Sequence, residues 1–212
     1  MPDKLNIAVF ASGRGSNFHA ILDAISAGSI PDTRVVLAVS NNSEAGALAV
    51  ARENGIPAMH LSQKQFPSEE LFAEAMAGAL KDHGVNFIAL AGYMKKLPSA
   101  VIRMFPGRVV NIHPALLPAF GGKGMYGIHV HEAVIAARSK RSGATVHIVD
   151  EEYDHGPIVL QREVDVAESD TPESLAAKIL PIEHRIYPEA IRLFAEGRVK
   201  VLGRAVTITG ER

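Results

Sequence analysis

Asn111 and His113 end a run of residues typical of a buried strand, and Pro114 follows them directly. Residues i and i+2 of a strand project to the same face, so this amide and this imidazole should converge just outside the sheet. An amide donor beside an imidazolium can stabilise an oxyanion. The pair therefore indicates acyl or one-carbon transfer, in which a carbonyl becomes tetrahedral. For each residue alone, a structural role at the strand end is favoured over a catalytic one.

Asp154 lies in an acidic turn, residues 150–157, that Gly156 and Pro157 close. A carboxylate placed next to His113 would raise the pKa of the imidazole or relay protons. The neighbouring acids Asp150, Glu151 and Glu152 are as typical of a solvated surface as of a site. The acidic cluster therefore makes Asp154 a candidate without singling it out.

A glycine loop, Ser12-Gly13-Arg14-Gly15-Ser16-Asn17, joins the first predicted strand to the first predicted helix. Backbone N–H groups and the positive helix end at such a turn can hold a phosphate. No Gly-Lys-Ser/Thr follows, and Phe18 stands where a dinucleotide fingerprint needs its third glycine. Phosphate binding is favoured over a dinucleotide, and the alternative is a turn in which Ser16 or Asn17 only caps the helix.

Short β-rich runs alternate with longer segments of helical periodicity, which is typical of parallel βαβ units. We predict an α/β, Rossmann-like fold: an open, twisted, mostly parallel sheet with helices on both faces and an antiparallel C-terminal portion. Ligands of such sheets bind beyond the carboxyl ends of the strands, where the glycine loop and His113 would both lie. The predicted strands span residues 6–10, 34–40, 58–61, 87–91 and 109–113, and the predicted helices span residues 17–27, 45–53 and 68–83.

The second half of the chain is less regular. We expect a helix near residues 131–137, an antiparallel pair at 144–149 and 158–164, and a small hairpin from 199–202 and 206–209. The helical stretch 172–195 contains Pro181 and Pro188 and should be broken or kinked, because proline lacks an N–H and clashes with the preceding turn.

Length and composition limit the function classes. With 212 residues, we expect one domain over 1–212, with a phosphate-binding half at about 1–105 and a catalytic half at about 106–212. The 22 basic and 23 acidic side chains create no global field for nucleic acid or a membrane surface. No apolar run is long enough to cross a bilayer, and no cysteine is present. These features favour small-molecule partners and a cytoplasmic location.

The histidines outside the catalytic pair give weaker signals. His129 and His131 could ligate a metal if they stood on a strand, but no third ligand is suitably spaced, so solvent-facing or helix-capping roles and no metal are expected. His147, on a predicted strand, is interpreted as a core or supporting histidine.

Taken in order, these motifs resemble the phosphoribosylglycinamide formyltransferases of purine synthesis, a branch of the formyltransferase superfamily. The resemblance covers nearly the whole chain. It runs through the glycine loop, Leu90-Ala91-Gly92-Tyr93-Met94, Asn111-Ile112-His113-Pro114, Asp154-His155-Gly156-Pro157 and Glu183-His184.

The resemblance implies two small-molecule substrates, glycinamide ribonucleotide and the cosubstrate 10-formyltetrahydrofolate. It implies that Asn111, His113 and Asp154 are catalytic, with Asp154 keeping His113 protonated. The implied ribonucleotide contacts are Gly15, Ser16, Asn17 and Glu183. The implied folate contacts are Met94, Lys95, Lys96, Leu97, Asn111, Glu151, Glu152 and Tyr153.

Two segments depart from the family pattern. Where many relatives place an arginine for the folate tail, this chain reads Pro67-Ser68-Glu69-Glu70, which leaves Lys64 or Lys95 as substitutes. The glycine-rich segment 121–127 is either a mobile flap or a plain surface loop.

Three other functions would use some of the same residues. Formyltetrahydrofolate hydrolysis and formylation of initiator methionyl-tRNA are disfavoured, because those enzymes carry an extra N-terminal or C-terminal domain for which this chain has little room. A non-catalytic nucleotide-binding module would leave Asn111, His113 and Asp154 without a shared task. The oligomeric state is expected to be monomer or homodimer.

Overall fold

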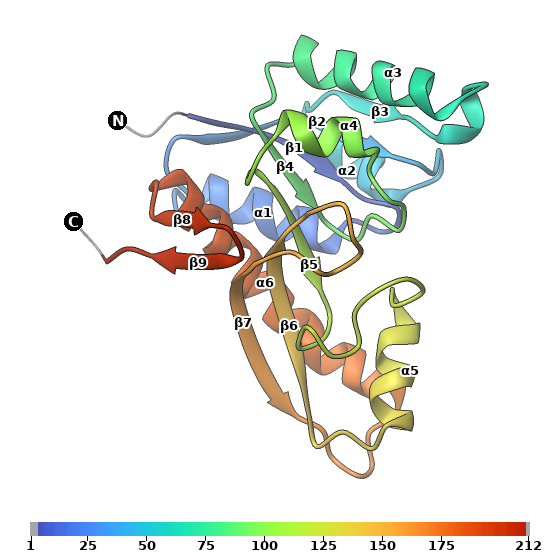
Figure 1. Cartoon of the computed structure of the whole chain (residues 1–212), viewed down its shortest axis with the longest axis vertical. Coiled ribbons are helices and arrows are strands. Elements are labelled where there is room, and N and C mark those ends of the chain that lie inside the picture. Colours follow the sequence, from blue (N-terminus) through green and yellow to red (C-terminus); the bar gives the residue numbers. More distant parts are fainter. Residues whose placement is uncertain (1–3, 211–212) are drawn as a thin grey trace.

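The computed structural model describes residues 4–210. Strands and helices alternate through the first half of the chain, and the second half adds antiparallel strands and one long helix (Figure 1). The strands are β1 (Leu5–Phe10), β2 (Thr33–Ser40), β3 (Ala58–His60), β4 (Phe87–Leu90), β5 (Val109–His113), β6 (Arg141–Ile148), β7 (Ile158–Asp165), β8 (Val199–Leu202) and β9 (Ala205–Ile208). The helices are α1 (Ser16–Ser26), α2 (Gly46–Glu53), the 3-10 turn η1 (Gln63–Gln65), α3 (Glu69–Asp82), α4 (Ser99–Met104), α5 (Ile128–Ala136) and α6 (Pro172–Ala195).

One seven-stranded sheet, in the order β3-β2-β1-β4-β5-β6-β7, organises the molecule. The strands from β3 to β5 pair in parallel, and β6 and β7 continue the sheet antiparallel. The chain reverses its direction of winding between β1 and β4, so the loops after β1, β4 and β5 meet at one edge of the sheet. This arrangement confirms the predicted fold class.

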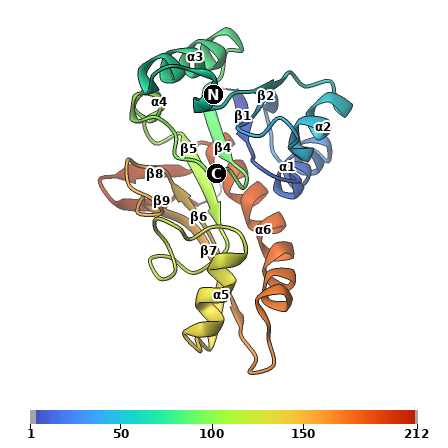
Figure 2. The same ribbon diagram turned by 90° about the vertical axis from the view of Figure 1, so that its right-hand side faces the viewer.

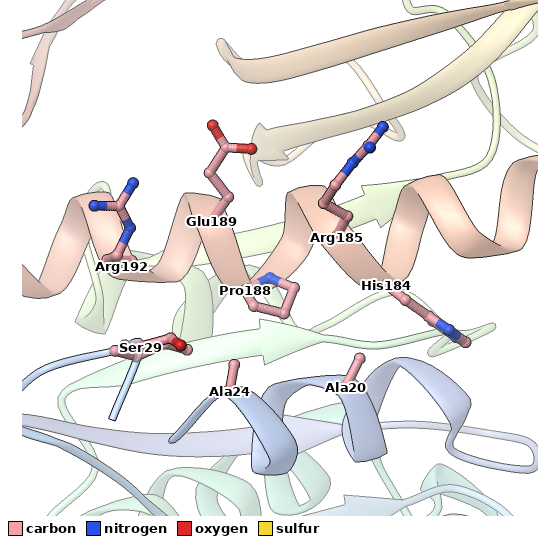
Figure 3. A pocket seen from close by; sticks show the side chains of 9 residues that line it. Ala20, Ala24, Ser29, His184, Arg185, Pro188, Glu189 and Arg192 are labelled. Atoms are coloured by element: carbon pink, nitrogen blue, oxygen red, sulfur yellow. The ribbon is translucent and has the colours of Figure 1, made fainter. Parts of the chain in front are cut away.

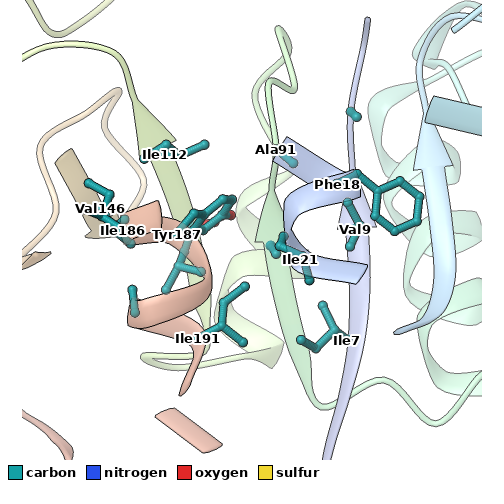
Figure 4. Close-up of a cluster of buried hydrophobic side chains, with 14 of the residues drawn as sticks. Ile7, Val9, Phe18, Ile21, Ala91, Ile112, Val146, Ile186, Tyr187 and Ile191 are labelled. Atoms are coloured by element: carbon teal, nitrogen blue, oxygen red, sulfur yellow. The ribbon is translucent and has the colours of Figure 1, made fainter. Parts of the chain in front are cut away.

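Apolar side chains of the strands alternate between two cores. In β1, Ile7 and Val9 face the core under α1, α2 and α6, whereas Ala8 and Phe10 face the core under α3 and α4. Figure 4 shows the first of these cores, where Tyr187 of α6 lies among the strand and helix residues. Burial of both faces explains why the parallel strands read as nearly continuous apolar runs.

The last long helix was expected to be broken or kinked. The break is wrong, because Pro172–Ala195 forms one uninterrupted helix with Pro181 and Pro188 inside it, and the kink stays a prediction. Its apolar face is buried along the sheet, and Tyr187, fully buried, directs its hydroxyl at the carbonyl oxygens of Leu90 and Val110, at 3.0 and 3.2 Å. Packing over six turns outweighs the helical hydrogen bonds lost at the two prolines.

The remaining elements follow the predictions closely. The antiparallel pair is present as β6 and β7, and β8 and β9 form the expected hairpin. Helix α4 and η1 were not predicted, because both are too short to show a helical period. In the described part of the chain, no helix is both long and apolar enough to cross a membrane. Figure 2 shows α6 running along one side of the sheet, and α3 and α4 together at the top of the view.

Candidate active site

The loops after β1 and β4 are joined by hydrogen bonds through Ser12. The Ser12 backbone N–H donates to the Gly92 carbonyl at 3.0 Å, and its Oγ accepts from the Met94 N–H at 2.8 Å. Because β4 also pairs with β5, the glycine loop, the segment around Met94 and the end of β5 at His113 share one sheet edge.

The glycine loop turns into α1 at Gly15. This residue has φ +84°, and a Cβ added there would lie 2.9 Å from Cα of Ala47 in α2, so both the backbone and its surroundings require glycine. No side chain caps the start of α1. The amide groups of Ser16 and Asn17 at this helix end are therefore suited to an anionic ligand.

Glu183 of α6 reaches the glycine loop from far along the sequence. Asn17 Nδ2 donates to Glu183 Oε2 at 2.7 Å, while Asn17 Oδ1 is buried without a hydrogen-bond partner in the described structure. Burial raises the pKa of Glu183, and the bond from Asn17 only partly opposes the shift. The pair leaves an unpaired amide oxygen beside the start of α1.

Two neighbouring hollows lie along the groove between α1 and α6, and their volumes are about 350 and 420 Å³. The first is bordered by Ala20 and Ala24 on α1 and by His184 and Arg192 on α6 (Figure 3). The second shares Ala20 and His184 and begins at Ser16. Neither hollow is lined by Asn111, His113 or Asp154.

His113 and Asp154 face one another at the end of β5. Nδ1 of His113 lies 3.6 Å from Oδ2 of Asp154, and its Nε2 lies 2.8 Å from the carbonyl oxygen of Phe120. That carbonyl can only accept, so Nε2 carries a proton, and Nδ1 is left facing the carboxylate. The same Oδ2 accepts the N–H of Gly122 at 2.9 Å.

His147 joins Asn111 to this pair, which agrees with the interpretation as a buried supporting histidine, although its partners were not predicted. Its Nε2 lies 3.1 Å from Nδ2 of Asn111 and 3.5 Å from Oδ1 of Asp154, and its Nδ1 lies 3.0 Å from the carbonyl oxygen of Ile148. Pairing of Asn111 with His147 across β5 and β6 produces this contact. The sequence predicts His147 on a strand. Because residues paired across two strands share a face, pairing of that strand with the Asn111–His113 strand would place His147 beside Asn111.

Burial and neighbouring charges shift the pKa values of His113 and Asp154 in opposite directions. Burial lowers the pKa of His113 below its usual range. The charge of Asp154 raises this pKa, as expected, and the Phe120 carbonyl acts in the same direction, but the two offset burial only in part. That Asp154 keeps His113 protonated during the reaction stays a prediction. Burial alone would raise the pKa of Asp154, but the contact with His147 and the charge of His113 bring it below its usual range. Asp154 is therefore an anion at neutral pH.

The glycine-rich segment 121–127 contacts both sides of the site. Gly122 donates to Asp154, and a Cβ added at Gly127 would lie 3.7 Å from Cε of Met94. The segment thus borders the carboxylate and the loop after β4, whether or not it moves.

The two segments expected to hold the cosubstrate lie next to each other. Nζ of Lys96 stands 5.8 Å from the ring centroid of Tyr153, and Arg103 of α4 binds Glu151 at 2.8 Å. Met94, Lys95, Lys96 and the 151–153 stretch are exposed, whereas Leu97 is buried. The structure therefore brings exposed apolar and polar groups of the two segments together beyond the sheet edge.

The His-x-His segment lies on α5 instead of a strand. His129 is exposed and bonds Glu132 at 2.9 Å. The solvent-facing or capping role expected for His131 is wrong: the residue is buried, and burial together with the charge of His113 lowers its pKa. Among residues 4–210, no three histidine or acidic side chains form a group that could hold a metal ion.

The open sheet, the glycine loop and the Asn, His and Asp side chains at its edge define a Rossmann-like group-transfer enzyme. The chain belongs to the formyl transferase family, whose model matches residues 5–191. It is 46% identical to the chloroplastic phosphoribosylglycinamide formyltransferase of Arabidopsis thaliana over 94% of this chain and 68% of that protein. It is 35% identical to the Escherichia coli phosphoribosylglycinamide formyltransferase over 98% and 95% of the two chains.

A solved structure agrees with these relatives. The glycinamide ribonucleotide transformylase 1 of Symbiobacterium toebii superposes with a TM-score of 0.91 at 44% identity, over 97% of this chain and 94% of that one. The name of the plant relative places that protein in the chloroplast. The cytoplasmic location, the division into two halves and the monomer or homodimer state of the present chain stay predictions.

Proposed function

We propose that this protein transfers the formyl group of 10-formyltetrahydrofolate to the glycinamide amine of glycinamide ribonucleotide, in purine biosynthesis. The observation that carries the proposal is the contact series Asn111, His147, Asp154 and His113 at the sheet edge that also holds the glycine loop. The Arabidopsis thaliana and Escherichia coli relatives, which match over 94% and 98% of this chain, have this activity in their names.

The ribonucleotide takes the side of the site near α1. Its phosphate is held by the amides of Gly15, Ser16 and Asn17 at the uncapped start of α1. Its ribose hydroxyl groups face Glu183 and the unpaired Oδ1 of Asn17, two acceptors that a hydroxyl donor would satisfy. This arrangement directs the amine of the ribonucleotide toward the end of β5.

10-Formyltetrahydrofolate takes the other side of the site. Met94, Lys95, Lys96 and Leu97 form one wall of its pocket, and Glu151, Glu152 and Tyr153 form the other. The exposed Met94 and Tyr153 offer apolar surface to a flat ring system, and neighbouring backbone groups offer hydrogen bonds. Asn111 lies between this pocket and His113.

The reaction forms a bond between the amine nitrogen and the formyl carbon and breaks the bond between that carbon and N10 of the folate. In the tetrahedral intermediate the formyl oxygen is an anion, which the Asn111 amide and the His113 imidazolium stabilise. The proton lost by the attacking amine moves to N10 of the leaving folate, with Asp154 and His113 as the relay. The products are formylglycinamide ribonucleotide and tetrahydrofolate.

In the free protein, the Phe120 carbonyl accepts the Nε2 proton of His113. The formyl oxygen takes the place of this carbonyl when the substrates bind, because His113 needs a free N–H to stabilise the intermediate. Asp154 then faces Nδ1 and favours the charged imidazole that the transition state needs.

The test is a spectrophotometric assay of the purified protein with 10-formyltetrahydrofolate, in the presence and absence of glycinamide ribonucleotide. We expect deformylated folate to appear only when the ribonucleotide is present, with formylglycinamide ribonucleotide as the matching product. Equal release without the ribonucleotide would identify a hydrolase instead. Binding of the ribonucleotide with no release of deformylated folate in either case would favour a binding module.

A further inference from the structure

The hairpin of β8 and β9 contacts the loop that carries Asp154, although it lies beyond residues 5–191, the part that the family model matches. Strand β9 packs beside β7, the strand that this loop enters (Figure 1). Arg204 stands in the turn of the hairpin, and its Nη2 donates to the main-chain carbonyl of His155 at 2.7 Å. Its Nη1 lies 2.9 and 3.1 Å from the two ring nitrogens of His155.

The bond from Arg204 acts on the peptide unit that follows Asp154. Asp154 has φ +54°, a left-handed conformation that is uncommon for residues other than glycine, although aspartate adopts it more readily than most. A carbonyl held in place at His155 limits rotation of the backbone on the carboxyl side of Asp154. The Asp154 carboxylate accepts the Gly122 N–H at 2.9 Å, whereas its contacts with His113 and His147 are 3.6 and 3.5 Å long. Its direction toward the two histidines therefore depends on this backbone as well as on the bond from Gly122.

The charges around Arg204 favour the contact. His155 Nδ1 lies 3.2 Å from Asp150 Oδ2 and 3.9 Å from Glu152 Oε2, so the guanidinium approaches a ring that is flanked by two carboxylates. Arg103 of α4 binds the third acid of the loop, Glu151, from another element. Two cations from separate parts of the chain thus hold an acidic loop at two points.

We propose that Arg204 is a positioning residue for Asp154 and for the folate-facing stretch 151–153, and that the C-terminal hairpin is a working part of the active site. The proposal rests on the proposed function, in which this loop supplies Asp154 and one wall of the folate pocket. It predicts a defect in use of the formyl donor, with use of the ribonucleotide unchanged, because the glycine loop is held by α1 and α6.

The experiment compares Arg204→Ala and Arg204→Lys with the matched control Lys200→Ala. Lys200 stands on β8 of the same hairpin, opposite Thr207 of β9, and is exposed. Its side chain makes no hydrogen bond or ion pair with any residue that the structure describes. Hydrogen exchange of the amides in 150–156 is measured without substrates, and kcat and both KM values are measured in the formyl transfer assay.

We expect Arg204→Ala to speed exchange in 150–156 and to raise the KM for the formyl donor by about two- to fivefold, as for loss of one exposed charged hydrogen bond. The lysine variant should recover part of both effects, since its ammonium can still donate to the His155 carbonyl. Lys200→Ala should match the wild type.

Unchanged exchange and unchanged donor KM in Arg204→Ala would overturn the proposal. If Arg204→Ala loses protection from hydrogen exchange throughout the sheet, the lysine variant provides the test. Restored protection of the amides in 150–156 in Arg204→Lys supports the proposal. Exchange there as fast as in the alanine variant overturns it. Because exchange is measured without substrates, absence of formyl transfer by the wild type would refute the proposed function without altering this readout.

Discussion

Nε2 of His147 lies 3.1 Å from Nδ2 of Asn111, on neighbouring antiparallel strands. An amide NH₂ can only donate, so this contact is a hydrogen bond when Nε2 is unprotonated and Nδ1 donates to the carbonyl of Ile148. Nε2 also lies 3.5 Å from Asp154 Oδ1, and with a proton on Nε2 the Asn111 amide would have to present its oxygen to keep the hydrogen bond. The proton on His147 therefore sets which way the Asn111 amide points.

Replacement of His147 tests this coupling. We expect His147→Leu to lower kcat by about tenfold or more, because Asn111 loses its buried partner and Asp154 loses a contact. In a double-mutant cycle, Asn111→Ala should cost less in the His147→Leu background than in the wild type. Strictly additive losses in log kcat would show that the two side chains act independently.

His113→Ala should separate catalysis from binding. The glycine loop and Glu183 do not contact His113, so calorimetry should give a ribonucleotide affinity close to that of the wild type. Turnover should fall by about 100- to 10,000-fold, since the general acid and the oxyanion contact are lost together. A parallel loss of ribonucleotide binding and of the folded state would argue for a structural role instead.

Asp154→Asn should move the pH dependence in a defined direction. The charge of Asp154 raises the pKa of His113 against the larger effect of burial, so its removal lowers this pKa further. Activity that needs protonated His113 disappears as pH rises through its pKa, and in the variant this decline should occur at lower pH. The pH profile of kcat/KM measures the shift. A decline at the same pH as in the wild type would exclude an effect of Asp154 on the His113 pKa.

Glu183→Gln should stabilise the free protein while it weakens ribonucleotide binding. Burial raises the pKa of Glu183, so above its ordinary pKa of 4.5 the unfolded chain releases this proton more readily and stability falls as pH increases. Glutamine removes that loss, and its amide oxygen can still accept from Asn17. Thermal melts should show a gain at pH 8 that vanishes near pH 4.5, and a gain that does not depend on pH would contradict the reasoning.

Gly156→Ala should disturb the Asp154 loop through the backbone. A Cβ at this position would overlap the carbonyl of Ile148, so we expect a loss of about 1–3 kcal/mol in the free energy of unfolding, together with reduced turnover. Gly78→Ala is the matched control: it lies inside α3 with no atom within 4 Å of the added Cβ, and should gain about 0.5–1 kcal/mol. Urea titration of both variants measures the two changes, and a stable Gly156→Ala protein would show that the loop adapts.

Much of the fold was predictable because it depends on local patterns. Apolar runs in β1, β4 and β5, separated by segments of helical period, specify buried parallel strands and their order in the chain. The strand that stops at His113 placed Asn111 and His113 on one face, and the glycine loop after β1 placed a possible anion site at the same edge. Each inference needed only residues that are close in sequence.

The rest depended on contacts between distant segments. Asn17 and Glu183 meet across 166 positions, His147 reaches Asn111 and Asp154 through strand pairing, and Arg204 meets His155 through the packing of a hairpin. Burial then outweighed the effect of Asp154 on the His113 pKa, and packing kept α6 whole despite two prolines. Desolvation and cross-chain packing arise only when the chain is assembled, so no local pattern could reveal them.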